Sequence, residues 1–181
     1  MYQGYRRIFW GIFFLTFTIN LGSLKILPSF AAYLIIHSGI KTLQNEHSSH
    51  LLDRASKASV VATIISILEI VFVWFVDLDN QSYLAVLWMT IIILIELILI
   101  YFLLVASTDI LQHYDHKELA QEYDKKMRIY ISSYTLLAIV IIISYTFSFI
   151  TIMTLASIAM IILRIWLMAI VNSLKKVGAF V

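Results

Sequence analysis

Residues 83–106 read YLAVLWMTIIILIELILIYFLLVA and carry one charged side chain, that of Glu96. About 20 consecutive apolar residues are enough for an α-helix to cross the hydrocarbon core of a bilayer. This stretch therefore predicts a transmembrane helix, with Glu96 inside the hydrocarbon. A charge at that depth costs about 3 kcal/mol or more unless it is paired, hydrated or neutralised.

The composition extends this prediction to the whole chain. Of the 181 residues, 61% are hydrophobic and only 13% are charged, about half the charged fraction of a soluble domain. Residues 1–181 are therefore expected to form one integral membrane domain. The chain has no cysteine, which excludes disulfides and cysteine-ligated metals. Its net charge of +2 reflects basic residues in connecting segments and predicts no nucleic-acid partner.

Six transmembrane helices in three antiparallel hairpins account best for the apolar pattern, so the expected fold class is all-α. Residues 129–174 would form a single helix of roughly 69 Å, more than twice the thickness of the bilayer core, and must fold back near Tyr145–Phe149. Segments 44–58 and 108–128 are rich in helix formers and predict short helices along the membrane surface. The expected spans cover residues 7–21, 27–43, 59–76, 83–106, 129–147 and 150–174.

The orientation follows from the basic residues. In the six-span arrangement one side receives eleven lysines and arginines, and the other receives only Lys25. Cytoplasmic segments of membrane proteins carry the excess of such residues, so both termini are expected in the cytoplasm. The eleven basic residues are Arg6, Arg7, Lys41, Arg54, Lys57, Lys117, Lys125, Lys126, Arg128, Lys175 and Lys176.

Three charges interrupt the apolar spans and are the candidate binding residues: Glu69, Glu96 and Arg164. Counting from the cytoplasmic helix ends places each of them roughly 15 Å deep, near the middle of the bilayer. Two carboxylates and one guanidinium leave one negative charge, so either a proton or a cation is expected to join them. The sequence leaves open whether this cluster locks helices together or binds a small solute.

Polar residues recur at helical spacing in three of the spans. Because lipid cannot satisfy polar groups, these stripes are expected to face other helices or water, and packing between helices is the favoured role of their hydroxyl groups. The stripes are Ser29, Tyr33, His37 and Lys41; Ser59, Thr63, Ser66 and Glu69; and Thr154, Ser157, Arg164 and Asn172.

Histidines form a second group in the two cytoplasmic loops. Residues 46–53 read E-H-x-x-H-x-x-D and residues 109–116 read D-x-x-x-H-x-D-H. Histidines three apart on a helix share a face and can bind one divalent metal. A solvated surface with titrating histidines is the favoured interpretation, and no cofactor is expected. The candidate metal ligands are His47, His50, His113 and His116.

No catalytic motif is recognisable, which favours a non-enzymatic protein. The leading hypothesis is a small membrane component of a transport system that binds a small solute or cation at the charged layer. One alternative is an immunity or regulatory protein that docks on a partner, and another is a metal-dependent membrane enzyme. The expected partners are the lipid bilayer and either a transporter ATPase or another membrane protein at the cytoplasmic loops. A homo-oligomer is compatible with this arrangement.

Residues 19–33, INLGSLKILPSFAAY, and 39–43, GIKTL, resemble the N-terminal hairpin of small, uncharacterised multi-pass membrane proteins of Gram-positive bacteria. In that family the turn typically reads I-L-P-D-F-I-G-Y and the second helix ends G-L-x-x-L. Here Ser29 replaces the usual acidic residue and Ala32 the usual glycine. The resemblance implies a bacterial plasma membrane location and no activity. Size and topology are also similar to the substrate-binding membrane subunits of energy-coupling-factor vitamin transporters.

Overall fold

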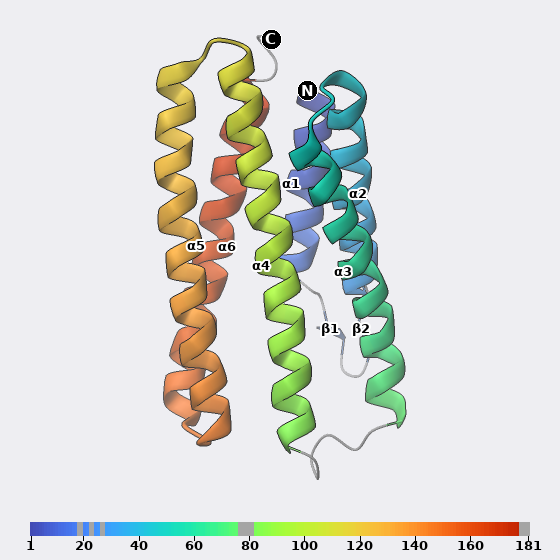
Figure 1. Ribbon diagram of the computed structural model, residues 1–181. Coiled ribbons are helices and arrows are strands. Elements are labelled where there is room, and N and C mark those ends of the chain that lie inside the picture. The colour runs from blue at the N-terminus through green and yellow to red at the C-terminus, as the bar shows by residue number, and fades with distance from the viewer. Residues whose placement is uncertain (18–19, 22–23, 26–27, 76–81, 178–181) are drawn as a thin grey trace.

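The computed structural model describes residues 1–17, 20–21, 24–25, 28–75 and 82–177. This part of the chain forms six α-helices and one antiparallel pair of two-residue strands (Figure 1). Each helix packs against the next, and α1 packs against α6, so the helices form a closed ring. The elements are α1 (Tyr2–Thr16), β1 (Asn20–Leu21), β2 (Leu24–Lys25), α2 (Ser29–Glu46), α3 (His50–Phe75), α4 (Ser82–His113), α5 (Lys117–Thr146) and α6 (Ile150–Val177).

The helices alternate in direction along the bundle. The N-terminus, the end of α6 and the α2–α3 and α4–α5 connections lie at one end of the bundle (Figure 1). The α5–α6 turn lies at the opposite end, whereas β1 and β2 lie only partway toward it. The strand pair does not reach the opposite end because α1, which precedes it, has only 15 residues and is therefore roughly 22 Å long.

Three of the described helices, α4, α5 and α6, are long and apolar enough to cross a membrane, judged by length and composition. Their outer faces carry large apolar side chains that are more than 60% exposed, including Leu136, Leu155 and Ile162. Exposed apolar surface on this scale is typical of a lipid-facing protein. The helical fold and the membrane character predicted from the sequence are thus confirmed.

The turns after α4 and α5 use the same helix-ending motif. After α5, the N–H of Phe149 donates to the carbonyl of Ser144, and the N–H of Ser148 donates to that of Tyr145. Ser148 has φ of 56°, and Asp115 takes the equivalent position after α4 with φ of 64°. These bonds form a Schellman motif, which usually has glycine at the left-handed residue. The predicted reversal within Tyr145–Phe149 is therefore present although that run contains neither glycine nor proline.

The expected surface helices at 44–58 and 108–128 are absent from the described residues, and this prediction was wrong. Segment 44–58 is divided between the end of α2 and the start of α3, and 108–128 between α4 and α5. Extending an existing helix adds a hydrogen bond for each residue fixed, whereas a separate helix must also be nucleated. The helix-forming residues therefore lengthen their neighbours.

The first expected span, 7–21, is also placed differently. α1 begins at Tyr2 and ends at Thr16, and Asn20–Leu21 belongs to β1. The residues after Thr16 are Phe17, Thr18, Ile19 and Asn20, which have low helix propensity. The polar turn expected at 22–25 contributes Leu24–Lys25 to β2, and Gly22 and Ser23 lie outside the described residues.

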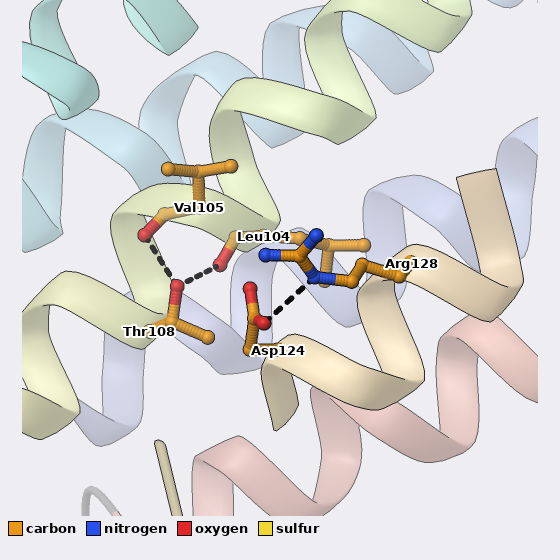
Figure 2. A network of polar contacts seen from close by, with 5 residues as sticks. All are labelled: Leu104, Val105, Thr108, Asp124 and Arg128. Carbon is orange, nitrogen blue, oxygen red and sulfur yellow. Dashed lines mark hydrogen bonds and ion pairs between the residues drawn. The ribbon is translucent and has the colours of Figure 1, made fainter. Parts of the chain in front are cut away.

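Polar contacts at the N-terminal end of α5 indicate a solvated surface. Arg128 donates from Nε to Asp124 at 2.9 Å, and nearby on α4 the Thr108 hydroxyl donates to the carbonyls of Leu104 and Val105 (Figure 2). A similar pair on α3 joins Lys57 to Asp53 at 2.7 Å. The hydrogen bond from Lys57 lowers the pKa of the Asp53 carboxyl below its ordinary value. Exposed pairs of this kind contribute little stability but mark helix ends that extend into water.

Glycines allow α1 and α2 to approach closely. A Cβ atom added to Gly39 would lie 2.7 Å from Cγ1 of Ile8 and 2.8 Å from the carbonyl oxygen of Gly4. At Gly11 it would lie 2.4 Å from Cγ1 of Ile36. Small residues at helix contacts are a common basis of packing inside membranes, where the hydrophobic effect does not draw helices together. The buried side chains of Ile8 and Ile40 fill the same interface.

We predict that Gly39→Ala lowers the melting temperature of the purified protein. Helix propensity alone would favour alanine by about 1 kcal/mol, but the new methyl group would meet the backbone oxygen of Gly4, which cannot rotate away. The control is Ala169→Gly on the exposed face of α6, which should cost about 1 kcal/mol through propensity alone. A higher melting temperature for Gly39→Ala would contradict the close approach of α1 and α2.

Candidate functional site

A buried ion pair connects α4 to α6. The Nη2 atom of Arg164 lies 2.5 Å from Oε2 of Glu96, and the Glu96 side chain is 4% exposed. Both residues lie near the middle of long helices, far from the solvated ends. The low polarity around them strengthens their attraction and raises the free-energy cost of leaving either charge without its partner.

The end of α1 contributes to the same ion pair. Nη1 of Arg164 donates to the carbonyl oxygen of Leu15 at 3.5 Å, one residue before α1 ends. The last four carbonyls of a helix have no partner within the helix and carry the negative end of its dipole. A guanidinium at this position is therefore stabilised by both the Glu96 carboxylate and the helix end. The short length of α1 is what places the helix end beside Arg164.

A cavity of about 210 Å³, which we call the charged cavity, opens beside the ion pair. It brings together all three charges proposed from the sequence, since Glu69, Glu96 and Arg164 all line it. Five helices contribute to its wall. The remaining lining residues are Leu15, Ser29, Tyr33, Ala62, Ile65, Ser66, Ile92 and Ile95.

The lining combines charge with hydroxyl groups. Its charged side chains are two carboxylates and one guanidinium, so its formal charge is −1. Ser29, Tyr33 and Ser66 add hydroxyl groups, which can donate or accept hydrogen bonds. Buried Nε of Arg164 has no hydrogen-bond partner within the described part of the chain. An occupant of the cavity would therefore meet a net negative charge together with several polar groups.

Three buried tyrosines surround the ion pair. Tyr33 on α2 and Tyr130 and Tyr134 on α5 all interact electrostatically with Glu96 and Arg164. Tyr130 and Tyr134 are at most 1% exposed. These two α5 residues were not among the candidates proposed from the sequence. Their spacing of four within an apolar span was the available signal, because it places two phenol groups on one helix face.

A polar seam between α2 and α3 leads toward the charged cavity. Nδ1 of His37 lies 2.9 Å from the hydroxyl of Ser59, and from there Thr63 and Ser66 continue along α3 to the cavity wall. These three α3 side chains are buried. Each hydroxyl also donates to a carbonyl of its own helix, as Thr108 does in Figure 2. The seam is thus compatible with the packing role expected for these hydroxyl groups.

The expected polar stripe of the sixth span does not face the bundle as a whole. Arg164 points into the charged cavity, but Thr154 and Ser157 are exposed. Their hydroxyls donate to the carbonyls of Ile150 and Met153, respectively. A hydroxyl that donates to its own helix in this way has a hydrogen-bond partner without contacting another helix.

The loop histidines lie near the α2–α3 and α4–α5 connections and do not line the charged cavity. His47 and His113 are brought together, with ring centroids 4.8 Å apart. His47 is half-buried, and His50, His113 and His116 are exposed. The close pair therefore comes from two different loops. It is neither of the pairs expected from the spacing of three residues within one loop. Among the described residues, no group of three or more His, Cys, Asp or Glu side chains is arranged to hold a metal ion.

Comparisons with known protein families, curated proteins and solved structures found no match.

The ion pair predicts a strong coupling between its two members. Glu96→Leu or Arg164→Leu alone should lower the free energy of unfolding by about 3–5 kcal/mol, because each leaves a buried charge without its partner. The double variant should recover most of this loss. Denaturant unfolding in detergent micelles, arranged as a double-mutant cycle, measures the coupling.

The matched control is the exposed pair Glu122–Lys126 on α5, whose coupling should be about 0.3–0.5 kcal/mol. Additive effects of the Glu96 and Arg164 substitutions would show that the two side chains do not interact in the folded protein.

Proposed function

We propose that this protein is a small membrane component of a transport system, and that its charged cavity binds a small cation. The observation that carries this proposal is the convergence of Glu69, Glu96 and Arg164 on one cavity with a formal charge of −1. A single excess negative charge in a low-polarity environment is stabilised by one monovalent cation. Ion sites inside membrane proteins are commonly built from such intramembrane charges.

The size of the cavity limits the ligand. Pockets for drug-sized molecules usually measure about 300–1,000 Å³, and the charged cavity is smaller, at about 210 Å³. It could hold several water molecules, each of which occupies about 30 Å³ in the liquid. A partly hydrated metal cation or a small protonated amine fits this volume, whereas a vitamin-sized solute does not. The proposed substrate class is therefore a small monovalent cation.

The proposal includes six transmembrane spans with both termini in the cytoplasm of a bacterial cell. It is supported by the excess of basic residues on one side in the sequence and by the alternation of helix direction in the bundle. Glu96 and Arg164 would then lie near the bilayer midplane, where transporters commonly bind their substrates. A partner such as a transporter ATPase would contact the α2–α3 and α4–α5 connections.

The polar seam supplies a candidate route to the site. Along α3, Ser59 and Thr63 precede Ser66 of the cavity wall, and the start of α3 lies at the end of the bundle that we place in the cytoplasm. His37 of α2 contacts Ser59. Inside a membrane, polar groups in a row between helices provide partners that a hydrated ion needs and that lipid lacks. We therefore propose this seam as the route by which a cation would enter from the side on which a partner would act.

The experiment is a thermal-stability titration of the purified protein with methylammonium, sodium and potassium chlorides at constant ionic strength. A ligand that binds only the folded state stabilises it by RT ln(1 + [L]/Kd), or about 1.4 kcal/mol at ten times Kd. We expect at least one of these cations to raise the melting temperature saturably. Glu69→Gln should abolish the effect because it removes the excess negative charge of the cavity.

Glu118→Gln, at the first turn of α5, removes the same charge away from the cavity and should leave the titration unchanged. If none of the three cations stabilises the wild-type protein, or if Glu118→Gln reduces the effect as much as Glu69→Gln does, the proposed cation site is wrong.

A further inference from the structure

We propose that a groove between α1 and α2 is a binding site for an anionic phospholipid, separate from the charged cavity. The groove has a volume of about 460 Å³ and lies toward the end of the bundle that holds the N-terminus. We call it the headgroup groove. Its lining residues are Tyr2, Gln3, Arg6, Arg7, Trp10 and Ile35.

The charge of the headgroup groove favours an anion. Of the described residues that line it, two are arginines and none is acidic. Both Arg6 and Arg7 are exposed, so their guanidinium groups are accessible. Lys175 of α6 lies 5.6 Å from the ring centroid of Tyr2 and adds a third positive charge at the edge of the groove. Arginine matches the geometry of a phosphate because its planar fork can donate two parallel hydrogen bonds.

Arg7 is held in position by α2. Its Nη1 atom donates to the Ser38 hydroxyl at 2.8 Å and to the Thr42 hydroxyl at 3.1 Å. These two bonds use both hydrogens of Nη1, while the guanidinium has five N–H donors in all. The remaining donors lie on Nε and Nη2. A guanidinium fixed in this way loses less conformational entropy when it binds a phosphate than a mobile side chain would.

The polarity of the groove changes along the helix axis. Gln3, Arg7 and Trp10 lie at spacings of four and three and therefore share one face of α1. On the antiparallel α2, Thr42, Ser38 and Ile35 also share a face, and Arg7 contacts the first two of these residues.

Both rows therefore run from polar to apolar in the same direction. The change from Arg7 to Trp10 takes three residues, roughly 4.5 Å along the axis. A phospholipid has the same sequence of chemistry, with an anionic phosphate followed by apolar chains.

The apolar end of the groove resembles an interfacial anchor. Trp10 is 44% exposed and packs against Phe13 and Phe14, which extend the aromatic surface away from the arginines. Tryptophan favours the boundary between headgroups and hydrocarbon in a bilayer. Leu34, next to Ile35 on α2, is 49% exposed. A free phosphate would use only the arginine end, whereas a phospholipid would occupy both ends, and for this reason we assign the groove to a lipid.

The test measures lipid binding to the purified full-length protein by native mass spectrometry in a mild detergent. The probes are phosphatidylglycerol, phosphatidylcholine and inorganic phosphate. We expect tighter binding of phosphatidylglycerol than of phosphatidylcholine. Arg6→Gln with Arg7→Gln should weaken phosphatidylglycerol binding about 30-fold, which corresponds to the loss of two basic contacts with an anionic lipid.

The matched control, Lys57→Gln with Lys117→Gln, removes the same charge from exposed positions on α3 and α5 and should change the affinity less than threefold. Arg6→Gln alone keeps the bonds from Arg7 to α2, so it tests the site even if the double variant does not fold.

Equal binding of the two lipids would overturn the proposal, as would a control effect as large as that of the arginine variant. Displacement of phosphatidylglycerol by an equimolar amount of inorganic phosphate would identify the groove as a phosphate site and exclude the lipid assignment.

Discussion

The ion pair between Glu96 and Arg164 is the interaction on which the inner arrangement of the bundle depends. It joins α4 to α6, and the carbonyl oxygen of Leu15 brings the end of α1 to the same guanidinium. A buried ion pair seldom adds net stability compared with apolar residues of the same size, because both charges lose their hydration. The pair instead favours one arrangement of the helices, because arrangements that separate the two charges are strongly disfavoured. Tyr33, Tyr130 and Tyr134 surround the pair with buried phenol groups.

The charged cavity follows from this arrangement and from the short first helix. α1 ends beside Arg164, and the wall is completed by side chains from α2, α3 and α4. An ion pair alone would be electrically neutral, but Glu69 gives the cavity its formal charge of −1. This net charge of the lining is the feature on which the proposed binding role rests.

Much of the fold could be predicted from the sequence because lipid imposes simple rules. Long apolar runs must be helical in a bilayer, and a 46-residue run must reverse, so the six helices of the bundle and the α5–α6 turn could be predicted, although the two additional surface helices were wrong. The helix ends did not follow, because the apolar pattern continues past Thr16 while local propensity and the β1–β2 pairing end α1 there. The continuous α3 was missed for the opposite reason: solvated residues such as Asp53 and Lys57 continue an existing helix beyond the apolar segment.

The candidate site was predictable in part. Glu69, Glu96 and Arg164 were recognisable because each is a charge within an apolar span, and counting residues along straight helices placed them at one depth. Tyr130 and Tyr134 were not recognisable in this way, since tyrosine is common in membrane helices and its partners depend on how α5 is rotated. The contribution of Leu15 could not be read from the side-chain pattern at all, because it comes from a backbone carbonyl exposed by the end of α1.

The most direct test of the central claim is equilibrium dialysis with the radiolabelled form of whichever cation among methylammonium, sodium and potassium stabilises the wild-type protein. The dialysis compares the wild-type protein with the triple variant Glu69→Leu, Glu96→Leu and Arg164→Leu. Replacing the whole charged cluster leaves no buried charge unpaired, so the variant should fold with a melting temperature close to that of the wild type. We predict one saturable binding site in the wild-type protein and none in the folded triple variant. Equal binding by both proteins would contradict this prediction.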